Sequence, residues 1–126
     1  MKIRIKGDSL RLRVLRSELD RLLTAGRIEE TIHFPAGPNA SLTYALEIAT
    51  GNNETSVCYR QGEIVVVLAA SDVHIWAQED RVGVYKELHN NGRIFSLMVE
   101  KDFACLDETG EDQSDTFANP HHAGIC

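Results

Sequence analysis

The sequence lacks the features that would place it in a membrane or on an export pathway. Its longest apolar run, Ile64–Ala70, has the length of a buried strand and is too short to cross a bilayer. The first fourteen residues alternate charged and apolar side chains, so they do not contain the continuous apolar stretch of a signal peptide. We therefore expect a cytoplasmic protein without a membrane partner.

Cysteine is scarce, and its number is odd. Cys58, Cys105 and Cys126 are the three cysteines of the chain, and the cytoplasm keeps thiols reduced. A framework of structural disulfides is therefore not expected. A disulfide between Cys105 and Cys126 is the alternative if the protein meets an oxidant.

Common catalytic and nucleotide-binding motifs are also missing. The chain has no Gly-x-Ser-x-Gly turn, no Gly-x-x-x-x-Gly-Lys loop and no Gly-x-Gly-x-x-Gly loop. Ser71, Asp72 and His74 lie close together, but at an expected helix start, where a serine commonly serves as the N-cap. The residues alone therefore assign no catalytic group and no specific activity.

Charge is distributed unevenly along the chain. The net charge of −6 disfavours non-specific binding to nucleic acid. Residues 1–28 nevertheless carry eight Lys and Arg against three acidic residues, whereas residues 100–126 carry one Lys against seven acidic residues. The two ends of the chain should attract each other or serve different partners.

The pattern of apolar residues predicts a single α+β domain over residues 1–103. Period-two alternation on both sides of Gly7 indicates a hairpin, and a helix capped by Ser17 and ended by Gly26 should follow. A loop is expected over residues 31–40, and Ser71 should cap a second short helix. Further strands are expected at residues 42–48, 57–59, 63–69, 81–88 and 93–101.

These elements predict one largely antiparallel, seven-stranded sheet that carries two short helices and can curl towards a barrel. Residues 104–126 should form an irregular, acidic C-terminal arm that packs on the domain or trails from it. No internal repeat is evident at the level of residues.

The first candidate site is a basic face on the N-terminal hairpin. Alternation predicts that five cations project from the same side of its two strands: Lys2, Arg4, Lys6, Arg11 and Arg13. Like charges across a sheet repel, so a small anionic ligand or an acidic protein would stabilise them. Two alternatives remain open. The cations either pair with glutamates of neighbouring strands or with the acidic arm, or form a solvated face that protects a sheet edge.

The second candidate is a zinc site in the C-terminal segment. Thiolates and imidazoles are the ligands that zinc prefers, and this segment supplies Cys105, His121, His122 and Cys126. Only His122 and Cys126 have the close spacing typical of a structural site, so a polar arm without a metal is the competing interpretation. The acidic stretch from Asp107 fails the EF-hand pattern, because the glycine and glutamate positions hold Asp112 and Ala118.

Several segments of the chain together resemble a family of small uncharacterised bacterial proteins. The segments are Met1–Gly7 with Leu10–Arg13, Leu42–Glu47, Glu100–Leu106, Glu111–Asp112 and Asn119–Pro120. The resemblance covers nearly the whole chain and implies one compact domain without an assigned activity. His121 and His122 are not part of the shared pattern.

A weaker similarity connects the alternating basic strands to the triphosphate tunnel enzymes, which bind phosphate inside an antiparallel barrel. The N-terminal strand of that family reads Glu-x-Glu-x-Lys and holds a metal, whereas the matching positions here are Lys2, Arg4 and Lys6. Tunnel chemistry would require carboxylates such as Glu47, Glu63 or Glu100 to point inward.

The sequence therefore supports three hypotheses. The first is a non-enzymatic binding module that uses the basic face. The second is structural zinc binding by the C-terminal segment, and the third is a phosphate-processing enzyme of the tunnel type. Homo-oligomer formation is left open by the sequence.

Overall fold

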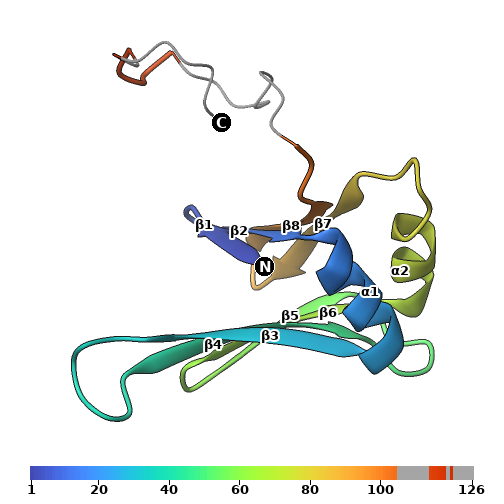
Figure 1. Cartoon of the computed structure of the whole chain (residues 1–126), viewed down its shortest axis with the longest axis horizontal. Helices are drawn as coiled ribbons and strands as arrows, with labels where there is room; N and C mark the ends of the chain where they lie inside the picture. The colour runs from blue at the N-terminus through green and yellow to red at the C-terminus, as the bar shows by residue number, and fades with distance from the viewer. Residues whose placement is uncertain (105–113, 119, 121–126) are drawn as a thin grey trace.

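The computed structural model describes residues 1–104, 114–118 and 120. These residues form two four-stranded sheets and two helices (Figure 1). Sheet A has the strand order β1 (Lys2–Ile5), β2 (Ser9–Val14), β8 (Arg93–Lys101) and β7 (Gly83–Asn90). Sheet B has the strand order β3 (Arg27–His33), β4 (Ser41–Ile48), β6 (Glu63–Leu68) and β5 (Ser56–Arg60).

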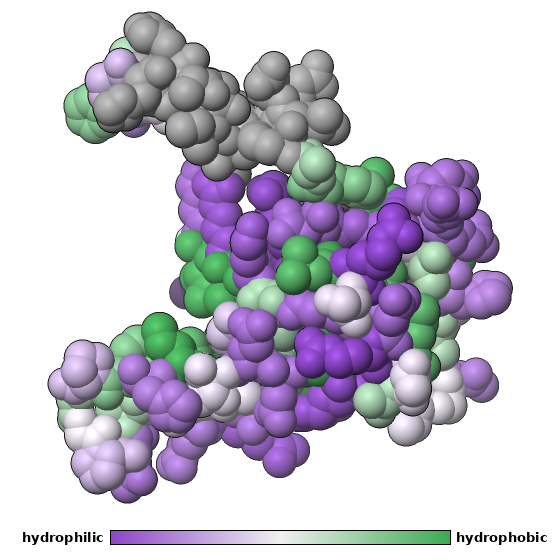
Figure 2. Space-filling model, viewed as in Figure 1, coloured by the Kyte–Doolittle hydropathy of each residue, from purple (hydrophilic) through white to green (hydrophobic). Residues whose placement is uncertain are grey.

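Both helices lie at the same end of the two stacked sheets (Figure 1). The helices are α1 (Arg16–Ala25) and α2 (Ala70–Trp76), and each connects one sheet to the other. The buried core contains strand residues such as Leu12 and Leu46 together with helix residues such as Leu22 and Trp76. In contrast, the surface seen in Figure 2 is largely hydrophilic, with small apolar patches.

The two halves of the chain have the same order of elements. Each half contains a hairpin, a helix and a second hairpin, so that β1–β2–α1–β3–β4 is followed by β5–β6–α2–β7–β8. Each sheet takes one hairpin from each half. The second strands of these hairpins pair in parallel at the centre of the sheet, β2 with β8 and β4 with β6.

A pair of equivalent backbone hydrogen bonds supports the correspondence between the two halves. The carbonyl of Val14 accepts a 2.9 Å bond from the Asp102 amide, and the carbonyl of Leu68 accepts a 2.7 Å bond from the Ala49 amide. Val14 and Leu68 each end the second strand of their half and each precede a helix. The fold is therefore a structural pseudo-repeat, which the dissimilar side chains of the two halves conceal.

The predicted α+β class with two short helices is confirmed, but the predicted sheet is wrong. The described residues form eight strands rather than seven, in two mixed sheets, and neither sheet closes into a barrel. The additional strand is β3, and the other three hairpins were predicted from local sequence patterns. The parallel pairs join segments that are distant in the chain, so no local sequence pattern predicts them.

Residues 31–33, assigned to a loop from the sequence, instead belong to β3. Glu30 interrupts the apolar alternation of this strand because it faces the N-terminal amino group rather than the core. The predicted end of the first helix at Gly26 is confirmed by its left-handed φ of 80°. The predicted caps Ser17 and Ser71 are wrong.

Leu15 and Ala69 occupy the two N-cap positions. Their own amides donate hydrogen bonds to the side chains of Glu18 and Thr55, respectively, and neither N-cap residue forms a side-chain cap hydrogen bond. Within the described part of the chain, neither helix is long and apolar enough to cross a membrane.

Candidate functional site

The β1–β2 hairpin presents its cations on the face that points away from the core. In the antiparallel register Lys2 lies opposite Arg13, and Arg4 lies opposite Arg11. The alternate residues of β2 are buried, so the arginines necessarily occupy the other face. We call Lys2, Arg4, Lys6, Arg11 and Arg13 the basic face.

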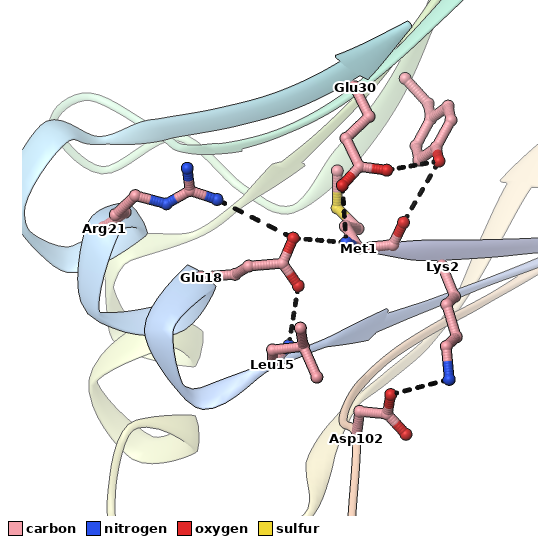
Figure 3. A network of polar contacts seen from close by, with 8 residues as sticks. Met1, Lys2, Leu15, Glu18, Arg21, Glu30 and Asp102 are labelled. Atoms are coloured by element: carbon pink, nitrogen blue, oxygen red, sulfur yellow. Dashed lines mark hydrogen bonds and ion pairs between the residues drawn. The ribbon is translucent and has the colours of Figure 1, made fainter. Parts of the chain in front are cut away.

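Carboxylates of the C-terminal end of β8 compensate part of this charge. Arg11 Nε lies 3.0 Å from Glu100 Oε1, and both side chains are only 17% exposed. Lys2 Nζ lies 3.1 Å from Asp102 Oδ2, a contact visible in Figure 3. The predicted pairing with glutamates of neighbouring strands therefore occurs at Glu100, and Asp102 adds a second partner.

Tyr85 of β7 completes the network around Glu100. Its hydroxyl donates a 2.7 Å hydrogen bond to Glu100 Oε2. Burial and the adjacent carboxylate raise the pKa of Tyr85 to about 12, so the hydroxyl stays protonated at neutral pH. Glu100 is thus held between Arg11 and Tyr85 and is unable to swing towards the other cations without losing both contacts.

Lys6 and Arg13 lie at opposite ends of the basic face, Lys6 beside the turn and Arg13 opposite Lys2. Both are exposed, and neither forms an ion pair with another residue of the described ranges. Lys6 is fixed by two backbone hydrogen bonds with Ser9, which extend the hairpin into its turn. Each end of the hairpin therefore presents an exposed cation, and exposed Lys and Arg side chains are suited to bind oxyanions.

A second polar cluster surrounds the N-terminal amino group (Figure 3). The ammonium group of Met1 is bound by Glu18 of α1 and lies 2.9 Å from Glu30 Oε1 of β3. Tyr44 donates a 2.8 Å hydrogen bond to the other oxygen of Glu30. Because Glu18 also accepts the Leu15 amide, one carboxylate joins the start of the chain to the start of α1.

Charge pairing controls protonation within this cluster. Burial lowers the pKa of the Met1 amino group, but its hydrogen bonds to Glu18 and Glu30 outweigh burial and raise it above the usual 8.0. The same contact with the ammonium lowers the pKa of Glu30 below its usual 4.5. Burial, followed by the bond to Glu30, raises the pKa of Tyr44 to about 12. The cluster is therefore fully ion-paired at neutral pH and serves stability.

A third polar cluster lies on the outer face of sheet B. Arg27 contacts Glu47, lies 3.2 Å from Glu29 and lies 3.5 Å from Glu63. The hydrogen bond to Glu47 raises the pKa of Arg27 further, so this group stays charged. Three carboxylates around one guanidinium have excess negative charge, and they repel rather than attract an anion.

These positions bear on the tunnel-type hypothesis. Glu47 alternates with the core residue Leu46, and Glu100 alternates with the core residue Val99, so both glutamates face away from the core. Glu63 contacts Arg27 on the same outer face. The described residues therefore do not place carboxylates and cations together inside a barrel.

The predicted zinc ligands Cys105, His121, His122 and Cys126 lie outside the described residues. Within the residues that the structure does describe, no three His, Cys, Asp or Glu side chains gather as a metal site. Cys58, the third cysteine, is exposed as a free thiol on β5.

A shallow depression of about 480 Å³ lies between α1 and β3. Arg21 and Arg27 line it, but both already contact glutamates, namely Glu18 and Glu29. We assign no function to this depression.

The cluster around Met1 was not predicted from the sequence. An acidic residue two positions after the start of a helix was the available signal, because Glu18 at this position is typical of a capping box. Its second role, binding the ammonium of Met1, depends on the tertiary placement of β1 beside α1.

The chain belongs to a family of unknown function, DUF7009, whose model matches residues 1–121. The expected resemblance to an uncharacterised family over nearly the whole chain is therefore confirmed. Neither the curated proteins nor the solved structures contain a match to the chain.

Proposed function

We propose that this protein is a non-enzymatic binding module whose basic face holds an oxyanion, either a small phosphorylated anion or the carboxylates of an acidic protein. The observation that carries the proposal is the register of β1 and β2, which sets Lys2 against Arg13 and Arg4 against Arg11. Directly opposed like charges destabilise a sheet, so this arrangement costs stability unless an anion offsets it.

The internal compensation is incomplete. Glu100 and Asp102 contact Arg11 and Lys2 near the middle and one end of the hairpin. Lys6 and Arg13 have no ion-pair partner among the described residues. In a protein whose net charge is −6, the basic face is a local positive region that would attract an anion by long-range electrostatics.

The geometry gives this binding role more support than a catalytic one. The basic face is an open sheet surface, whereas catalysis requires groups that converge on a reacting atom. The tunnel-type alternative gains no support from Glu47, Glu63 and Glu100, which face away from the core.

Thermal unfolding in the presence of inorganic phosphate, pyrophosphate and triphosphate tests the proposal. The melting temperature should rise with anion valence, and the rise should shrink as sodium chloride is added, because screening weakens exposed charge pairs. The double variant Lys6→Gln/Arg13→Gln should lose most of this rise.

The matched control is Arg16→Gln/Arg81→Gln, which removes the same charge from exposed positions outside the hairpin. It should respond to the anions like the unmodified protein. Equal responses of the two double variants, or no response of the unmodified protein to any of these anions, would contradict the proposal for small anions. The alternative ligand, an acidic protein, is tested by repeating the thermal unfolding with a synthetic polyglutamate peptide and the same two double variants.

A further inference from the structure

Each of the two sheets ends in two edge strands, and β5 differs from the other three. It pairs with β6 on one side only, over Ser56–Arg60. An edge strand has unpaired backbone N–H and C=O groups that are able to bind another strand. Proteins commonly block such edges with charged side chains.

The three other edge strands carry this protection, since each contains at least two charged residues. These are Lys2 and Arg4 in β1, Arg27, Glu29 and Glu30 in β3, and Lys86 and Glu87 in β7. In β5 the single charged residue is Arg60, which ends the strand.

The side chains of β5 are also unusually apolar for their exposure. Tyr59 is 74% exposed although it lies in register with Ile64, on the side of the sheet that packs against the core. Val57, on the same side, packs against the core and is half-buried. Cys58 is exposed on the opposite face.

The strand is complementary to itself when it runs antiparallel to a second copy. With Cys58 on the two-fold axis, Val57 lies opposite Tyr59 of the second copy, and Ser56 lies opposite Arg60. The first pair is a β-branched residue against an aromatic ring, a combination that stabilises antiparallel sheets. No like charges face each other in this register.

We infer that β5 pairs with β5 of a second copy of this chain, so that two sheets B join into one continuous sheet across a two-fold axis. The interface is isologous, and the basic faces on sheet A of the two copies stay outside it. The inference does not depend on anion binding by the basic face.

Sedimentation equilibrium of the full chain tests the inference. The protein should have about twice the chain mass of 14.0 kDa at high concentration. Tyr59→Lys adds the charge that the other edges carry and should weaken association by about tenfold or more. Ile75→Lys, an apolar-to-charged change at an exposed position on α2, should leave association unchanged.

Cross-linking through Cys58 locates the interface. In a Cys105→Ser/Cys126→Ser background, a short bis-maleimide should link two copies, and Tyr59→Lys should lower the yield of the link. A protein that stays monomeric at high concentration would overturn the inference. This holds even if β5 pairs with a strand of a different protein. A dimer that Tyr59→Lys does not weaken, or one that fails to cross-link through Cys58, would also overturn it.

Discussion

Glu18 and Asp72 occupy equivalent positions in α1 and α2, and each binds the residue that precedes the first strand of its own half. Glu18 binds the ammonium group of Met1, and Asp72 accepts a 2.7 Å hydrogen bond from the hydroxyl of Thr55. In both halves of the pseudo-repeat, a carboxylate of the helix therefore binds the residue before the first strand. The group that it binds is charged in the first half and neutral in the second.

Replacing Glu18 by glutamine should destabilise the protein strongly. Met1 is buried, and its ammonium would keep only the more exposed Glu30 as its charge partner. Breaking a buried ion pair typically costs several kcal/mol, so we expect a loss of about 2–3 kcal/mol. Urea unfolding of protein that begins at Met1 measures this loss, with the single tryptophan, Trp76, as the fluorescent reporter.

Asp72→Asn provides the comparison within the same fold. The amide still accepts a hydrogen bond from Thr55, and the ion pair with Lys86 is partly exposed, so about 1 kcal/mol should be lost. We expect Glu18→Gln to lose more unfolding free energy than Asp72→Asn because it leaves the ammonium of Met1 without its buried partner. Equal losses in the two variants would contradict this explanation.

Stability should fall as the pH rises above 8. The folded protein holds the pKa of the Met1 amino group above its unfolded value of 8.0, so this stabilisation is complete below pH 8 and is lost as the pH rises through the folded pKa. Unfolding free energies measured between about pH 7 and about pH 9.5 would show the decline before most tyrosines of the unfolded chain ionise. Glu18→Gln/Glu30→Gln should show a flatter profile, and an unchanged slope would contradict the assignment.

Gly83 should not tolerate a side chain. A Cβ atom at this position would lie 2.6 Å from the carbonyl oxygen of Val99 and 3.0 Å from Cγ of Glu100. Gly83→Ala should therefore cost about 1–3 kcal/mol, the range typical of steric overpacking, and should displace Glu100. Val82→Ala, at the exposed neighbouring residue, is the control in thermal unfolding, and a neutral Gly83→Ala would show that β7 moves aside freely.

Removing Glu100 should strengthen anion binding. Glu100→Gln would release Arg11 from its ion pair and add a net positive charge to the basic face. We expect about a tenfold gain in affinity for triphosphate by calorimetric titration, together with lower stability, because Tyr85 and Arg11 lose a shared partner. Glu87→Gln, on the exposed part of β7, removes the same charge and should have a smaller effect.

Local features of the sequence predicted local features of the fold. The hairpin turn at Asn91 and Gly92 is an example, because the Asn-Gly pair favours positive φ and these residues have φ values of 51° and 79°. The cations of β1 and β2 were assigned to one face because strands alternate. The predicted caps Ser17 and Ser71 were wrong because the helices begin earlier, and the side chains of Glu18 and Thr55 bind the amides of the N-cap residues Leu15 and Ala69.

The arrangement of the hairpins was not predictable in the same way. Three of the four hairpins were predicted from the sequence, and the β3–β4 hairpin was missed. The central pairs of β2 with β8 and of β4 with β6 join segments from different halves. The pseudo-repeat was also hidden, because equivalent positions such as Leu22 and Trp76 share burial rather than identity. The partner of Arg11 was among the expected glutamates, but only the parallel register of β2 and β8 selects Glu100.

The most direct test of anion binding is a map of amide chemical-shift changes by NMR while triphosphate is added. The account predicts changes concentrated in β1, β2 and their turn, led by Lys6 and Arg13, which disappear in Lys6→Gln/Arg13→Gln. Changes centred on Arg21 and Arg27, beside α1, or no changes at all would contradict it.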